Sequence, residues 1–249
     1  SEKIRDDGRP IPQWRTELRH IAGLRNSLTV VFLYLQTIGI VWLAVALHNP
    51  VTYVVAFVLM GRAHAQFASL MHESAHRLLF ATKSINDFVG RWLLGYPSFV
   101  NTDAYRFVHM AHHREEFGPN EPDIPLYANY PITSQSFRRK LIRDLFGITG
   151  TRLMRDQFAA LYKGDARSRN TQLKILSVQT LILAVFVAIG HPFLYFFLWL
   201  LPFLTVWRAI NRLRSIAEHG GLRADTDRRI ATHSVRQSNV ARFMLVPYN

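Results

Sequence analysis

Two long uncharged segments constrain this chain more than any other feature. Residues 26–61 and 175–207 contain no Asp, Glu, Lys or Arg, although the chain carries 30 Lys and Arg and 17 Asp and Glu. A run of about 20 apolar residues crosses a bilayer, so each segment has room for two such helices. Pro50 and Pro192 mark the expected turns, because proline suits the first turn of a helix. The sequence therefore predicts an all-α integral membrane protein with four transmembrane helices in two hairpins.

The charges around these segments predict the topology. Both turns lack charge and every flanking region is basic, so by the positive-inside rule the turns lie outside and both termini lie in the cytoplasm. We expect one domain over 1–249, with hairpins at about 28–70 and 173–210 and a helical cytoplasmic cap at about 71–172 and 211–249. The alternative is a soluble protein with two buried hairpins, which uncharged stretches of this length and composition disfavour.

Composition excludes several classes of protein. The chain has no cysteine, which excludes disulfides, iron–sulfur clusters and thiolate zinc sites. The positively charged residues, which give a net charge of +13, lie near the expected membrane ends of the helices, where topology and anionic lipid explain them, and no nucleic-acid-binding motif accompanies them.

The charged first 25 residues lack an A-x-A-type cleavage site, so we expect no cleaved signal peptide. We expect a multi-pass protein of a bacterial inner membrane.

Helical stretches and loops can be placed along the rest of the chain. The proline-free stretch 51–79 predicts a helix that continues beyond the bilayer, and the fourth helix, kinked at Pro202, is expected to continue to His219. Two segments mix basic and large apolar residues, and fit either interfacial helices on the membrane or surface helices of the cap: 91–100 and 140–162. Two others are rich in turn-forming and polar residues and predict loops: 114–136 and 163–172.

Histidines cluster on the expected cytoplasmic side. Residues 72–76 read HESAH, which matches the helical zinc-protease signature H-E-x-x-H, and residues 109–113 read HMAHH. His219 stands at the end of the fourth helix, while His64 is expected to be a polar group in the core. Residues four apart share a helix face, and imidazole suits zinc, copper, iron and nickel. These clusters predict a metal site at the ends of the membrane helices.

The number of imidazoles separates two kinds of metal site. An H-E-x-x-H protease holds one zinc with two helical histidines and one further ligand, and uses the glutamate as base. That reading employs His72, Glu73 and His76, with Glu218 or His219 as the third ligand, and leaves the second cluster without a role. Five or six imidazoles match two metals, and redox-active iron can activate O2 whereas zinc cannot. The sequence therefore favours a dinuclear oxygen-activating centre over an intramembrane zinc protease.

Three motifs resemble those of one known family. HESAH at 72–76, HMAHH at 109–113 and AEHGG at 217–221 look like the first box, the second box and the late single-histidine motif of membrane fatty acid desaturases. The resemblance covers about 55–249. It implies a cytoplasmic di-iron centre that uses O2 as co-substrate, a membrane lipid or acyl substrate held in a buried tunnel, and a redox donor such as a ferredoxin, a rubredoxin or a cytochrome b5-like protein. The activity that it implies introduces a double bond into a fatty acyl chain.

Residue roles follow from this resemblance and from the motif positions. The expected metal ligands are His72, His76, His109, His112, His113 and His219. Glu73 and Glu218 are the expected catalytic-site carboxylates, and the candidates for accepting the N–H groups of the ligands are Glu73, Asp103, Glu115, Glu116, Asp123 and Glu218. For each carboxylate, an ion pair with a nearby arginine is the competing interpretation.

Several alternatives stay open at this point. The family's third box, H-x-x-H-H, is expected just beyond Asn249, so we expect the given sequence to be truncated or to lack a tail. The same kind of site serves lipid hydroxylases and carotenoid ketolases or hydroxylases, and a non-catalytic membrane scaffold that kept the fold is a third possibility. The substrate, the bond position and the oligomeric state do not follow from the sequence.

Overall fold

Four long apolar helices dominate the computed structural model, which describes residues 3–115, 117–122, 130–222, 236 and 238–245. Among these residues the regular elements are all helical, with no strand beyond an isolated bridge between Ile4 and Pro10. Four helical stretches are long and apolar enough to cross a membrane. The prediction of an all-α membrane protein with four spanning helices in two hairpins is therefore confirmed.

The first hairpin joins α2 (Gly23–Leu47) to α3 (Pro50–Ala75). His48 ends α2 in the left-handed conformation with φ 42°, and the Asn49 side chain accepts a hydrogen bond from the Thr52 backbone N–H at 3.1 Å. Pro50 then begins α3, as the sequence predicts. Helix α3 ends at Ala75, four residues before the end of the proline-free stretch, and His76 forms its C-cap.

The second hairpin pairs α10 with an interrupted helix. Helix α10 (Ala166–Ala188) is followed by a π-helix, η2, and by a break in the helical backbone at Thr205. Pro202 lies between these two irregularities, where a helix interruption is expected from its missing N–H. The pieces of the fourth span run in order α11 (Pro192–Leu194), η2 (Tyr195–Leu200), α12 (Leu201–Leu204) and α13 (Val206–His219).

Helix α3 is the centre of the core. It contacts α2, α13, α12 and another π-helix, η1 (Val89–Gly95). Its buried apolar side chains include Met60, Phe67 and Met71. The contact with α13 is so close that a Cβ at Gly61 would lie 2.4 Å from Val206 Cβ. Because α3 packs against several other helices, the position of the histidines at its end is fixed.

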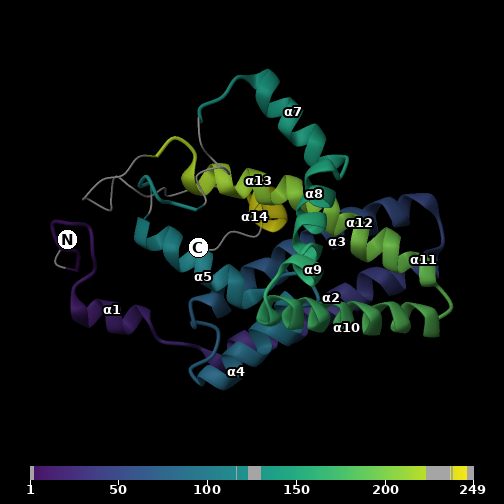
Figure 1. The fold of residues 1–249 in the computed structure, drawn as a ribbon, viewed down its shortest axis with the longest axis horizontal. Helices are drawn as coiled ribbons and strands as arrows, with labels where there is room; N and C mark the ends of the chain where they lie inside the picture. Colours follow the sequence, from purple (N-terminus) through teal and green to yellow (C-terminus); the bar gives the residue numbers. More distant parts are fainter. Residues whose placement is uncertain (1–2, 116, 123–129, 223–235, 237, 246–249) are drawn as a thin grey trace.

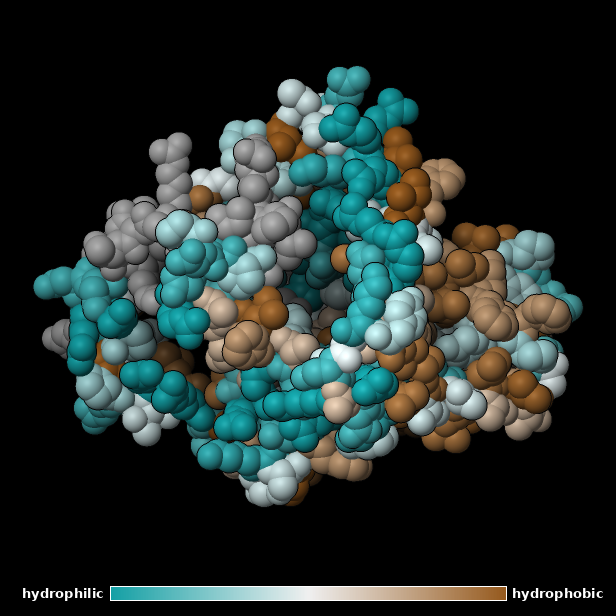
Figure 2. Space-filling view, viewed as in Figure 1, coloured by the Kyte–Doolittle hydropathy of each residue, from teal (hydrophilic) through white to brown (hydrophobic). Residues whose placement is uncertain are grey.

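The remaining elements lie away from the hairpin turns. In Figure 1 the turns of both hairpins lie at the right, and α1 and α5 lie at the left. Figure 2 shows many apolar side chains over the right-hand part of the same view and mostly hydrophilic ones among the other coloured residues. The helices outside the two hairpins are α1 (Pro12–Leu18), α4 (Lys83–Phe88), α5 (Thr102–Glu115), α7 (Ser134–Leu145), α8 (Ile148–Phe158), α9 (Ala160–Lys163) and α14 (Asn239–Leu245).

Two segments differ from the sequence-based expectation. Residues 94–99 are all buried, so segment 91–100 is part of the core and the prediction of a helix on the membrane or cap surface was wrong there. Gln179 of α10 explains its depth, because its side-chain amide donates to the carbonyls of Tyr96 and Pro97 at 2.7 and 2.9 Å. Helix α10 begins at Ala166, inside the stretch 163–172 predicted as a loop, because Asp165 caps it through the Ser168 backbone N–H at 2.8 Å.

Candidate metal centre

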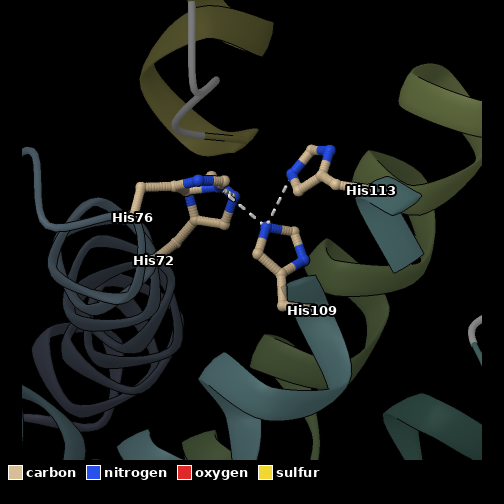
Figure 3. Close-up of side chains that lie close together, drawn as sticks. All are labelled: His72, His76, His109 and His113. Atoms are coloured by element: carbon tan, nitrogen blue, oxygen red, sulfur yellow. Dashed lines mark hydrogen bonds between the residues drawn. The ribbon is translucent and has the colours of Figure 1, made fainter. Parts of the chain in front are cut away.

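The end of α3 and the second half of α5 bring the two histidine clusters together. His72 lies in the last turn of α3 and His76 caps it, so both rings project from the same end of the helix. His109 and His113 lie one turn apart on α5. One ring nitrogen from each of these four residues lies within 4.8 Å of all the others. We call these four residues the four-histidine cluster; Figure 3 shows their rings converging from the two helices.

The Nε2 atoms form a continuous chain across the cluster. His76 Nε2 lies 3.2 Å from His72 Nε2 and 2.9 Å from His109 Nε2. His109 Nε2 in turn lies 3.1 Å from His113 Nε2. Two nitrogens that bind one metal ion at right angles, each at about 2.1 Å, lie about 3.0 Å apart. The spacing in the cluster is therefore that of neighbouring ligand atoms around one ion.

Hydrogen bonds alone cannot account for these contacts. An imidazole nitrogen carries either one hydrogen or one lone pair, so each makes one good hydrogen bond. His76 Nε2 and His109 Nε2 each face two other nitrogens, so at most two of the three contacts can be hydrogen bonds. If the two outer contacts are hydrogen bonds, then the contact between His76 and His109 is not a hydrogen bond, although at 2.9 Å it is the shortest of the three. A metal ion shared by the lone pairs fits this arrangement.

The electrostatic surroundings keep three of the four rings neutral. Burial, together with the neighbouring histidines, lowers the pKa of His109 to about 2. Burial and adjacent histidines likewise lower the pKa of His76 and His113 to about 4. At neutral pH these imidazoles hold no extra proton, and the neutral form is the one that binds metal.

Glu73 contacts His72 on the side away from the cluster. The His72 Nδ1–H donates to Glu73 Oε1 at 3.1 Å, and the opposite ring nitrogen, Nε2, is the one that faces His76. A carboxylate on the outer nitrogen of a ligand fixes the ring and its tautomer and makes the inner nitrogen a better donor. Glu73 therefore supports a candidate ligand, whereas the base of a zinc protease faces the metal-bound water.

A second carboxylate, which the sequence analysis missed, supports His112. Glu121 is buried, and its Oε1 accepts a short hydrogen bond from His112 Nδ1. Glu121 Oε2 accepts another from the backbone N–H of Phe117. The His112 ring lies 5.2 Å from the His113 ring and 4.9 Å from the His219 ring, measured between centroids. His112 and His219 thus adjoin the four-histidine cluster without joining it.

Arg106 connects the two helix ends that carry the clusters. It lies on α5, and its guanidinium donates to the carbonyls of Ser74 and Ala75 in the last turn of α3 at 2.9 and 3.0 Å. It also pairs with Asp87 at 2.6 Å. The two carbonyls belong to the turn between His72 and His76, at the end of the helix. The Ser74 carbonyl also accepts from the Arg77 backbone N–H at 2.9 Å, and Arg106 is the described donor to the Ala75 carbonyl. Arg106 therefore sets the distance between the first and second histidine boxes.

Asn86 holds the same turn of α3 from the other side. Its side-chain amide donates to the Ser74 carbonyl at 2.9 Å, and the Ser74 hydroxyl donates to the Asn86 carbonyl at 3.0 Å. Gly90 allows this approach, because a Cβ there would lie 1.8 Å from Ser74 Oγ. The segment between the two histidine boxes thus folds back tightly onto the end of α3.

The other predicted carboxylates take part in ion pairs. Glu218 pairs with Arg214 at 3.3 Å, and the structure places no cluster histidine against it among its described contacts. Asp103 pairs with Arg91 at 2.9 Å and Glu115 with Arg114 at 3.3 Å, so the arginine interpretation holds for all three. Glu116 and Asp123 lie outside the described residues.

Of the remaining histidines, His64 behaves as the sequence predicts. It is buried, and its Nε2 lies 3.0 Å from the carbonyl oxygen of Trp199. It is therefore a hydrogen-bonded group of the membrane core, separate from the four-histidine cluster.

Fold and site together define a class of protein: an integral membrane protein whose spanning helices carry a histidine-rich site suited to metal at one end. Comparison with known families assigns the chain within that class. The sequence model of the fatty acid desaturase family matches residues 48–249, which is most of the chain. The chain belongs to the fatty acid desaturase family, and the resemblance seen in the three motifs is confirmed. No sequence among the curated proteins matches the chain.

Proposed function

We propose that the protein is a di-iron, O2-dependent membrane oxidoreductase that introduces a double bond into a fatty acyl chain. The observation that carries this proposal is the chain of four Nε2 atoms from two helices, whose contacts exceed what hydrogen bonds explain. Family membership makes iron the natural occupant and an acyl chain the natural substrate. His112 and His219 adjoin the cluster and are the further imidazoles that a second ion would need.

The reaction requires both oxygen and external electrons. A –CH2–CH2– unit, O2, two electrons and two protons give –CH=CH– and two water molecules. Bound iron would supply the activation of O2, since it changes oxidation state. The chain's own residues hold the ligand rings in place: Glu73 orients His72, and Glu121 orients His112. A lipid hydroxylase on the same site differs only in returning oxygen to the substrate carbon.

Metal and product analysis test the proposal. Purified protein should contain about two iron ions per chain, and cells that produce it should accumulate unsaturated acyl chains detectable by mass spectrometry. One zinc per chain would indicate the protease, and no metal would indicate the scaffold. The protease further requires that Glu73→Gln abolish activity while His112→Ala is tolerated; a di-iron enzyme loses metal with His112→Ala.

Replacement of Glu121 tests the support of His112. We expect Glu121→Gln to keep the hydrogen bond in weaker form and Glu121→Ala to remove it, lowering metal affinity by roughly 10- to 100-fold in the alanine variant. Competition with a chelator, followed by metal quantification, measures the change. Glu115→Ala is the matched control, because Glu115 pairs with Arg114 at the surface of the same helix end. Equal affinity in the two alanine variants would contradict a role for Glu121.

The external electrons imply a redox protein that docks on the cap. We propose that this donor is acidic and that the basic, cytoplasmic side of the protein attracts it; exposed arginines there include Arg138, Arg139 and Arg152. Charge attraction of this kind weakens as salt rises. Turnover with a reconstituted donor should therefore fall several-fold between low and physiological salt at saturating lipid substrate. A rate that does not change with salt would contradict electrostatic docking.

A further inference from the structure

A pocket lined by arginines lies in the N-terminal segment, apart from the histidines. Its volume is about 640 Å³, and its lining consists of Arg5, Arg9, Arg15 and Arg19 with Thr16 and two prolines. No carboxylate is among these lining residues. The proposed oxidation chemistry gives this pocket no role.

Local backbone structure brings the four arginines together. A turn closed by the Arg5 N–H on the Arg9 carbonyl, at 2.8 Å, folds the first two toward each other. Gly8, with φ 77°, supplies the left-handed residue that this turn needs. Arg15 in helix α1 and Arg19 at its C-cap lie on one side of the helix, because they are four residues apart.

The positive charges of the pocket are poorly neutralised within the described residues. Arg9 contacts Asp7 at 3.6 Å with both side chains well exposed, which is a weak pair in water. Arg5, Arg15 and Arg19 form no ion pair with any described carboxylate. Gathering four like charges is unfavourable unless an anion joins them. Guanidinium groups match phosphate oxygens in geometry and bind them through paired hydrogen bonds.

The position of the segment indicates where such a phosphate comes from. Helix α1 has no buried residue, and Leu18 is 61% exposed, so packing against the rest of the protein does not hold this helix. The first membrane helix follows directly, with Leu24 77% exposed and Leu28 61% exposed. Exposed apolar residues beside arginines, at the start of a spanning helix, are typical of a segment that lies among the lipid headgroups of a membrane.

We infer that this pocket binds the phosphate group of an anionic membrane lipid and so fixes the N-terminal segment on the bilayer surface. The shared chemistry is a phosphate, which a lipid headgroup or a soluble phosphate could provide. The exposed apolar residues favour the lipid. This inference does not depend on the metal centre.

A binding experiment on the whole protein in detergent tests the inference. The probes are dioctanoylphosphatidylglycerol, dioctanoylglycerol with the same chains and no phosphate, and inorganic phosphate, each titrated and followed by native mass spectrometry. We expect saturable binding of the phosphatidylglycerol alone. Replacing Arg5, Arg9, Arg15 and Arg19 by Gln should weaken it at least tenfold, since each arginine near anionic lipid contributes about fivefold. The matched control replaces four exposed arginines of the cap and of α10: Arg138, Arg139, Arg152 and Arg169.

Each other outcome overturns the inference. Equal loss in both four-arginine variants would mean general charge attraction without a site. Equal binding of dioctanoylglycerol would mean that the acyl chains alone are recognised, and tight binding of inorganic phosphate would assign the pocket to a soluble anion. Unchanged binding in the pocket variant would exclude the pocket. Helix content by circular dichroism serves as the check on folding, and the pocket shares no residue with the histidine site.

Discussion

Replacing His109 by Ala is expected to empty the four-histidine cluster of metal. His109 Nε2 lies 2.9 Å from that of His76 on the other helix and 3.1 Å from that of His113, so its loss breaks the chain of donors in the middle. Removal of a ligand should lower affinity by more than the roughly 10- to 100-fold found for residues behind a ligand. Metal quantification and the optical or Mössbauer spectrum of the iron-loaded protein measure this loss.

The control for this variant is another histidine, outside the cluster. His20 is exposed, so His20→Ala removes an imidazole and leaves the metal site intact. We expect wild-type metal content in His20→Ala and near-complete loss in His109→Ala, with similar helix content by circular dichroism. Retention of metal in His109→Ala would show that the convergence of Nε2 atoms does not hold an ion.

Replacing Arg106 by Ala is expected to separate the two histidine boxes. The change leaves the Ala75 carbonyl without its described donor, removes one of several donors to the Ser74 carbonyl, and leaves Asp87 without its closest partner. A buried group left unpaired costs about 1–3 kcal/mol, so we expect a loss of about 1–3 kcal/mol in the free energy of unfolding. We also expect a fall in metal occupancy and an altered iron spectrum, because the end of α3 is no longer fixed against α5.

Arg91 provides the matched control. Arg91→Ala also removes an arginine that contacts Asp87, at 3.9 Å, and Asp103, at 2.9 Å, but it touches no carbonyl of α3. Arg91 is about one third exposed, so its loss should cost about 0–1 kcal/mol and leave the iron spectrum unchanged. Arg106→Lys should recover stability more than metal binding, because one ammonium cannot reach two carbonyls with a fixed geometry. Equal effects of the two alanine variants on the iron spectrum would show that Arg106 acts only through its charge.

The sequence predicted most of the site but little of what surrounds it. His72 and His76 share a side of one helix as expected, and so do His109 and His113, because each pair is four apart and spacing along a helix is a local property. The structure also brings the two pairs together. His112 and His219 adjoin the cluster, and whether they hold a second ion stays a prediction. Glu121 escaped notice because it lies in a segment without periodicity, where nothing in the local pattern shows which carboxylate turns inward.

Segment 91–100 shows why such errors arise. Its mixture of Arg91, Trp92 and leucines has the composition of a surface helix, yet residues 94–99 are buried. Its burial depends on Gln179, more than 80 residues away, which hydrogen-bonds its backbone carbonyls. A pattern within ten residues does not contain that partner.

The sequence by itself determined the membrane class, the two hairpins and the histidine boxes. It could do so because an unpaired charge in lipid is too costly for a spanning helix. The absence of charge over 26–61 and 175–207 therefore indicates membrane-spanning helices. Only the tertiary structure decided which nitrogens meet, and that Arg106 and Glu121 hold the histidines in place. These contacts join residues distant in the chain, and their distances depend on how whole helices pack rather than on any local spacing.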